Sequence, residues 1–236
     1  MNAVYRLTLR QLAGRWRFII MAILAALPVF ITFMGMDDTS PTVAAFEKTV
    51  IGGLLAGTIA PLIVLAIGTV AFGNEVEDKT LANLMLSPIA RWKIALPKLL
   101  GVFTVAAPFI AASALVTTYF GYIGDARGMI AVTAAVLIAV ALYSSFFVWL
   151  GLVTSQAIGV GLLYIVLWEG FLSRWISGVR FLSIRYYAVV LIHAIDPRTY
   201  ADQKLLSTTF AAVTSAVVLT GFLWLTIRKL RRMDVP

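Results

Sequence analysis

Long apolar stretches alternate with short polar connections along most of this chain. Six stretches approach or exceed the about 20 apolar residues that a helix needs to cross a hydrocarbon layer of roughly 30 Å. We predict six transmembrane helices, over Phe18–Met36, Lys48–Phe72, Leu99–Ile123, Met129–Val153, Ala157–Leu172 and Leu206–Ile227. The pattern therefore predicts an all-α membrane protein with one transmembrane domain over residues 1–236.

Residues 1–17 show a different pattern. Tyr5, Leu9, Leu12 and Trp16 recur at helical spacing, and arginines take the other side. Such a pattern is typical of an amphipathic helix that lies in the membrane interface with its apolar face toward the lipid. We therefore predict an interfacial helix before the first span.

Composition supports the membrane assignment and excludes several kinds of chemistry. The 236 residues are 61% hydrophobic and 13% charged, whereas soluble domains are about a quarter charged. The chain has no cysteine and one histidine, which excludes disulfides, thiol nucleophiles and Cys- or His-cluster metal sites. It also lacks the Gly-x-x-x-x-Gly-Lys-Ser/Thr loop of P-loop ATPases. We predict no catalytic residue, no metal site and no cofactor bound by this chain.

The distribution of basic residues predicts the orientation. The net charge of +8 indicates cytoplasmic loops rich in Lys and Arg rather than nucleic-acid binding. Four arginines lie within residues 1–17 and four cations within residues 228–232. Both termini are therefore expected in the cytoplasm, which agrees with an even number of spans. Residues 73–98 then lie inside, and residues 173–205 form an extracellular segment.

Lys and Arg are expected mainly on the cytoplasmic side, but the predicted outer segment, residues 173–205, is also basic. Its cations are Arg174, Arg180, Arg185, Arg198 and Lys204. Aromatic residues interleave with these cations, which favours short helices that lie at the interface. A hairpin that enters the membrane partway is the alternative.

The segment Gly73–Lys98 is polar although it lies between two apolar spans. Asn74 and Glu77 have the spacing of a capping box, which predicts a helix start. Ser87-Pro88 predicts a second start, of a helix that runs into the third span. Two short helices that meet at Ser87-Pro88 would form a knee below the membrane.

The residues of this segment follow a recognisable order. An acid-x-acid pair precedes Thr-Leu, a Leu-rich turn, Pro, Arg and a later Lys. This order, between the second and third of six spans, resembles the cytoplasmic signature of ABC-2 type transporter permeases. Lys79 and Pro97 depart from it, since glycine is usual at the first position and frequent at the second.

The resemblance implies a function for the segment. Within the segment 73–98, Gly73–Ala90 would contain a coupling helix that docks on a separate ABC ATPase subunit. The implied ATPase-coupling residues are Glu75, Glu77, Thr80, Leu81, Leu84, Met85, Pro88 and Arg91. Two ATPase copies would carry ATP and Mg, and a second copy of this chain or a homologous permease would complete an exporter in the cell membrane of a prokaryote. The apolar interior favours a lipid-like or amphipathic cargo.

Glu169 is the one acid well inside an apolar run. Ionisable groups at membrane depth are costly and often functional. Arg174 follows five residues later. A structural Glu169–Arg174 ion pair and a polar site for transport are the two alternatives.

Two other classes of protein share this composition. A stand-alone secondary carrier or channel is the first, but carriers often show inverted repeats with broken helices, and the sequence shows no such symmetry. A membrane-embedded enzyme is the second. It needs clustered acid, histidine or serine residues, which Glu169 alone does not supply.

Overall fold

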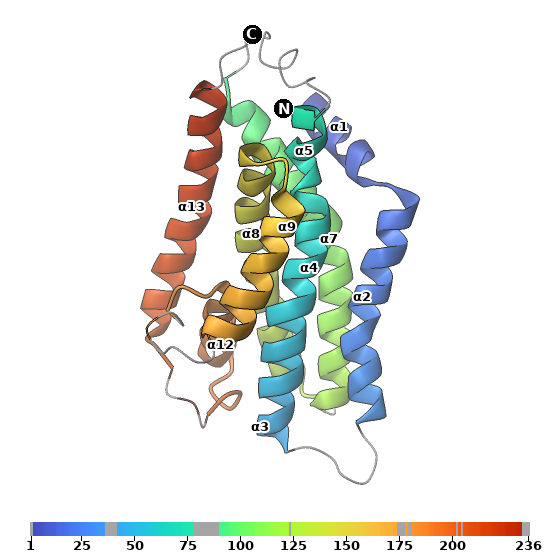
Figure 1. Cartoon of the computed structure of the whole chain (residues 1–236). Coiled ribbons are helices and arrows are strands. Elements are labelled where there is room, and N and C mark those ends of the chain that lie inside the picture. The colour runs from blue at the N-terminus through green and yellow to red at the C-terminus, as the bar shows by residue number, and fades with distance from the viewer. Residues whose placement is uncertain are drawn as a thin grey trace.

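The chain folds into a bundle of helices, and the two terminal helices reach the same end of it (Figure 1). The computed structural model describes residues 2–35, 42–77, 90–122, 124–173, 178, 181–201, 203 and 205–232. Within these residues all regular secondary structure is helical. The all-α prediction is confirmed for this part of the chain.

Five helical segments are long and apolar enough to cross a membrane. They are α2 (Arg15–Met34), a rod over Val43–Val76, α7 (Trp92–Gly121), α8 (Ala126–Val153) and α13 (Thr208–Arg232). Each covers one of the predicted spans. Many large apolar side chains on α2, η2 and α13 face outward, as they do in a protein surrounded by lipid. The chain is a multi-pass membrane protein.

The second of these segments is built from four consecutive helices. They are α3 (Val43–Phe46), the π-helix η1 (Glu47–Ile59), α4 (Ala60–Gly68) and α5 (Val70–Glu77). Pro61 lies in the first turn of α4, where η1 ends. A proline there lacks the N–H that would continue the hydrogen-bond pattern. We refer to these four helices together as the η1 rod.

The fifth predicted span, Ala157–Leu172, is shorter than the others. It comprises α9 (Ala157–Leu163) and the π-helix η2 (Tyr164–Leu172). After residues 173–183 follows another short apolar helix, α12 (Ile184–Ile195). α12 packs against α8, α13 and η1, and Tyr187, Val190 and Ile192 are almost fully buried. For residues 184–195 the structure favours a segment that enters the bundle over one that lies flat at its surface.

α8 is the central helix of the bundle, because it contacts α4, α5, α7, α12 and α13. Gly151 of α8 permits a close approach of this helix to the η1 rod. A Cβ atom at Gly151 would lie 2.2 Å from the carbonyl oxygen of Thr69. Small residues at such crossings let helices in membranes pack backbone to backbone.

The amino-terminal helix α1 (Asn2–Leu12) packs on α7. Its buried face includes Thr8 and Leu12, and Thr8 lies against Gly101 of α7. The chain then turns at Gly14, whose backbone is extended, and α2 begins at Arg15. Trp16 therefore lies on a different helix, and its side chain is 76% exposed. The prediction that Trp16 shares the apolar face of the first helix is wrong, since the turn at Gly14 separates the two faces.

Hydrogen bonds to Glu47 hold the opposite end of the bundle together. The backbone N–H of Tyr200 donates to Glu47 Oε2 at 2.8 Å, and the Tyr122 hydroxyl donates to Oε1 at 3.4 Å. The Tyr200 hydroxyl in turn donates to the backbone carbonyl of Glu47 at 2.6 Å. Tyr200 has a φ angle of 59°, a left-handed conformation that costs a non-glycine residue about 1–3 kcal/mol. The bonds to Glu47 stabilise that conformation.

An ion-pair network lies beside this cluster. Arg198 bonds Asp196 at 3.1 Å and Asp125 at 2.9 Å, which connects the start of α8 to the connection that follows α12. Burial by itself would raise the pKa of Asp196, but the hydrogen bonds and charge of Arg198 outweigh it, and the pKa lies below its usual value. Asp196 therefore stays ionised at neutral pH and holds this connection in place.

The crossing of α8 and the η1 rod yields a prediction. Gly151→Ala should destabilise the protein, because the new methyl group would overlap the Thr69 carbonyl. Overpacking of this kind costs about 1–3 kcal/mol, which lowers the melting temperature of a chain this long by at least about 2–4 °C. The measurement is thermal unfolding in detergent. Gly159→Ala is the control, because a Cβ atom there meets nothing within 4 Å. Equal melting temperatures for the two variants would refute the close crossing.

Candidate functional site

The two ends of the predicted cytoplasmic segment lie side by side. α5 leads into the segment and α7 leads out of it, and the two helices contact each other. Their adjoining ends lie at the end of the bundle that also carries α1 and the last turn of α13 (Figure 1). The segment therefore leaves and re-enters the bundle at one place.

A buried ion pair joins these two ends. Lys98 Nζ of α7 lies 2.6 Å from Glu75 Oε1 of α5, across 23 positions of sequence. The Lys98 side chain is 1% exposed and that of Glu75 is 16% exposed. Lys98 also donates to the backbone carbonyl of Ala71, and its ammonium lies 4.5 Å from the centroid of the Phe72 ring.

This arrangement explains how a lysine is accommodated in an apolar helix. A buried ammonium is costly unless its charge is paired and its donors find acceptors. Lys98 has a carboxylate, a carbonyl and an aromatic face, all from α5. Because all three partners belong to one helix, the ion pair holds α5 and α7 together where the segment begins and ends.

Most of the sequence-predicted coupling residues lie outside the described residues. These are Thr80, Leu81, Leu84, Met85 and Pro88, together with the Ser87-Pro88 knee. Glu77 ends the described part of α5, and its side chain lies outside the description as well. Glu75 pairs with Lys98, and Arg91 is the N-cap residue of α7. Their role in coupling stays a prediction.

One predicted helix start is wrong. Asn74 lies inside α5, which begins at Val70, so Asn74 and Glu77 do not form an N-terminal capping box. The helix of the second span instead continues past Gly73 to Glu77. α7 begins at Trp92, after Ala90 and Arg91, which are not helical. The start predicted at Ser87-Pro88 lies outside the described residues.

Glu169 occupies a second buried polar site, in η2. Its carboxylate accepts hydrogen bonds from the Ser183 hydroxyl at 2.5 Å, from the Ile184 N–H at 3.0 Å and from the Tyr164 hydroxyl at 3.0 Å. Ser183 is also the N-cap of α12, where its hydroxyl accepts from Tyr186 N–H. Glu169 thus anchors the first turn of α12 to η2, as a structural residue would.

The predicted partner of Glu169 cannot be compared with these contacts. Arg174 lies outside the described residues, so a Glu169–Arg174 ion pair stays a prediction. Among the described residues, no group of three or more His, Asp and Glu side chains is arranged to hold a metal ion.

Sequence reasoning missed two partners that the structure supplies. Lys98 was part of the motif but was not assigned a contact, although a charged residue at the edge of an apolar run indicates a buried partner. Ser183 gave a weaker signal, as a serine before an apolar helix. Neither signal identifies which acid lies opposite.

The Glu75–Lys98 ion pair predicts a non-additive effect on stability. Lys98→Met should destabilise the protein strongly, because it leaves Glu75 partly buried without its cation. Breaking a buried pair in this way costs roughly 3–5 kcal/mol, and the lower end applies because Glu75 keeps some contact with solvent. The double variant Glu75→Gln/Lys98→Met should recover part of the loss. Thermal unfolding of the purified variants provides the comparison.

Lys93→Met is the control for these variants, since Lys93 is an exposed cation of α7, the helix that carries Lys98. It should leave the melting temperature nearly unchanged. If the double variant is no more stable than Lys98→Met, the two residues are not energetically coupled.

Comparison with known proteins identifies the family. No curated protein matches the chain. Residues 9–173, well over half of the chain, match the family described as ABC-2 family transporter protein. The match includes α2, the η1 rod, α7, α8, α9 and η2, and hence the Glu75–Lys98 ion pair and Glu169. With several apolar helices of membrane-spanning length, the chain belongs to the ABC-2 transporter family of membrane permeases.

Proposed function

We propose that this chain is the membrane subunit of an ABC exporter and that it couples ATP hydrolysis by a separate ATPase subunit to transport. The family comprises membrane transport components rather than catalysts. Coupling, the direction of transport and the partner subunits are the parts that we propose. ATP and Mg would be bound by the ATPase and not by this chain.

The single observation that supports coupling most strongly is the Glu75–Lys98 ion pair. A segment that transmits force must be attached firmly to the helices that it moves. The ion pair fastens the segment at both ends, so a push on residues 78–89 would reach α5 and α7 together. A flexible attachment would dissipate such a push.

The η1 rod would carry this motion across the membrane. α5 continues from α4, which contacts α8 and α7 and carries the fully buried side chains of Ile63, Val64 and Ile67. Packed interfaces of this kind move as rigid bodies rather than deform continuously. Displacement of α5 would therefore shift η1 at the other end of the rod.

We also propose six crossings of the membrane. Five crossings would leave the two termini at opposite ends, whereas α1 and the end of α13 lie at the same end of the bundle (Figure 1). Segment 157–195, with α9, η2 and α12, would supply the sixth crossing in two pieces. The basic residues of α1 and of the last turn of α13 favour the cytoplasm for both termini.

A complete exporter would need two permeases and two ATPase subunits. The second permease would be another copy of this chain or a homologous one. The outward-facing apolar side chains of α2 and α13 offer surfaces for lipid and for such a contact. None of the described contacts favours a stand-alone carrier, a channel or an enzyme.

The orientation predicts which sites an impermeant thiol reagent can reach. The chain has no cysteine, so single cysteines can be introduced one at a time. Cysteines at Asp37 and Asp202 should react in intact cells, whereas those at Glu77 and Arg231 should react only after permeabilisation. Labelling of Glu77→Cys in intact cells would contradict the proposed orientation.

The coupling segment predicts a defect in ATPase binding. Leu84 lies outside the described residues, so this prediction depends on helical spacing, which groups Leu81, Leu84 and Met85 on one side. Burial of such a side chain is worth roughly 1.5–3 kcal/mol, so Leu84→Asp should weaken ATPase binding about tenfold or more. Co-purification of the tagged permease with its ATPase measures the effect.

Asn83→Asp is the matched control, because it introduces the same charge on the opposite side of the segment. Membrane insertion should be normal in both variants, since the segment is expected to lie outside the bilayer. If both variants retain the ATPase equally, residues 78–89 are not the coupling element.

A further inference from the structure

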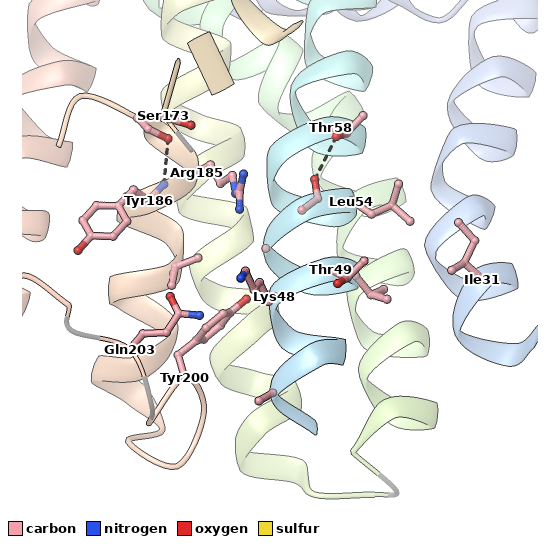
Figure 2. Close-up of a pocket in the computed structure, with 16 residues that line it drawn as sticks. Ile31, Lys48, Thr49, Leu54, Thr58, Ser173, Arg185, Tyr186, Tyr200 and Gln203 are labelled. Atoms are coloured by element: carbon pink, nitrogen blue, oxygen red, sulfur yellow. Dashed lines mark hydrogen bonds between the residues drawn. The ribbon is translucent and has the colours of Figure 1, made fainter. Parts of the chain in front are cut away.

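A large cavity lies beside η1 (Figure 2). It is at the end of the η1 rod that is remote from Glu75, the rod's partner in the ion pair with Lys98. Its volume is about 1230 Å³, and its walls come from α2, η1, α12 and the connection after α12. Ligand pockets usually measure about 300–1,000 Å³. The cavity can therefore hold a ligand considerably larger than a single ion.

Two cations from different elements reach into this space. Figure 2 shows Lys48 extending from η1 and Arg185 extending from α12 toward η1. Of the described residues that line it, these two are charged positively and none is acidic. The two neighbouring acids lie outside the lining and accept hydrogen bonds from the chain. Glu47 accepts from the Tyr200 N–H and the Tyr122 hydroxyl, and Glu169 accepts from the Ser183 hydroxyl and the Ile184 N–H. The cavity therefore favours a negatively charged ligand.

Glycines of η1 make room for the side chains on the opposite wall. A Cβ atom at Gly57 would lie 2.7 Å from Cδ of Arg185, and one at Gly52 would lie 2.9 Å from the Tyr200 hydroxyl. A larger residue at either position would displace these groups. η1 is also a π-helix of 13 residues, and π-helical turns are rare and frequent at functional sites.

The remaining lining has a polar and an apolar part. Thr49, Ser173 and Gln203 contribute hydroxyl and amide groups, whereas Ile31 and Leu54 contribute apolar surface. A guanidinium presents a planar fork and an ammonium a compact charge, and together they suit the oxygens of a phosphate group. The apolar surface on the side of α2 suits an acyl chain.

We propose that this cavity binds the phosphate head group of an anionic, lipid-like molecule, with Lys48 and Arg185 as its ligands. The Lys48 side chain is exposed and that of Arg185 is half-buried, so both can donate to phosphate oxygens from within the cavity. The further statement that the bound molecule is the transported cargo rests on the proposed permease function. The binding itself requires neither an ATPase nor transport.

Thermal unfolding of the full-length protein in detergent tests the proposal. A ligand that binds the folded state raises the melting temperature as its concentration rises. Dioleoylphosphatidylglycerol should do so, and the zwitterionic dioleoylphosphatidylcholine should not. Lys48→Gln and Arg185→Gln should each weaken the apparent affinity for phosphatidylglycerol about tenfold, the usual effect of losing a charged hydrogen-bond donor.

Arg127→Gln is the matched control. Arg127 lies at the same end of the bundle but outside the cavity, where it donates to the carbonyl of Ile195. Its loss should leave the affinity for phosphatidylglycerol unchanged, which separates specific binding from general attraction to a basic surface. If Arg185→Gln does not fold, Lys48→Gln still tests the proposal, because the Lys48 side chain is exposed and its replacement should not prevent folding.

Three results would overturn the proposal. They are equal stabilisation by the two lipids, unchanged affinity in Lys48→Gln, and stabilisation by inorganic phosphate without stabilisation by phosphatidylglycerol. The last result would identify the ligand as a free anion. A permease that binds phosphatidylglycerol but retains no ATPase would contradict the proposed function alone, so the two failures are distinguishable.

Discussion

Backbone N–H and C=O groups inside an apolar bundle must find partners within the chain, because neither lipid tails nor hydrocarbon side chains can bond them. This constraint explains why some charged side chains are buried in the bundle. The four charged residues that are buried in the described part of the chain are Glu47, Lys98, Glu169 and Asp196. Each of them bonds a backbone group: Tyr200 N–H, Ala71 carbonyl, Ile184 N–H and Arg198 N–H respectively.

The same constraint explains how the chain can be interrupted between η2 and α12, within the proposed sixth crossing. A break between η2 and α12 exposes N–H groups at the start of α12 that no preceding helical turn can satisfy. Glu169 and Ser183 bond two of them, those of Ile184 and Tyr186. The carboxylate costs free energy to bury, but it replaces partners that the interrupted helix lacks. Glu169 is therefore best understood as part of the backbone hydrogen bonding of this break.

The η1 rod connects the two proposals. Glu75 lies near one end of this rod and Lys48 near the other. Docking of an ATPase would act on the end with Glu75, and the head group would bind at the end with Lys48. A single packed rod links the two places, so a shift at one end changes the spacing between η1 and α12 at the other. Coupling of this kind requires no long chain of intermediate contacts.

The sequence by itself determined the helical class, the five long membrane helices and the membrane setting. Hydropathy over about 20 residues is a local property, and a helix satisfies its own backbone, so no information about neighbours is needed. The order of residues from Glu75 to Lys98 also indicated the family. The local signal failed at Asn74, because a capping pattern does not show whether a preceding helix continues.

Tertiary structure alone decided the contacts between distant elements. It brought Lys98 to Glu75, Ser183 to Glu169, and Lys48 to the same cavity as Arg185. It also decided that α12 enters the bundle. The physical reason is that a charged side chain in an apolar run requires a partner, but the sequence does not specify which one. That choice depends on how helices cross, and the crossings depend on close approaches such as that of Gly151 to Thr69.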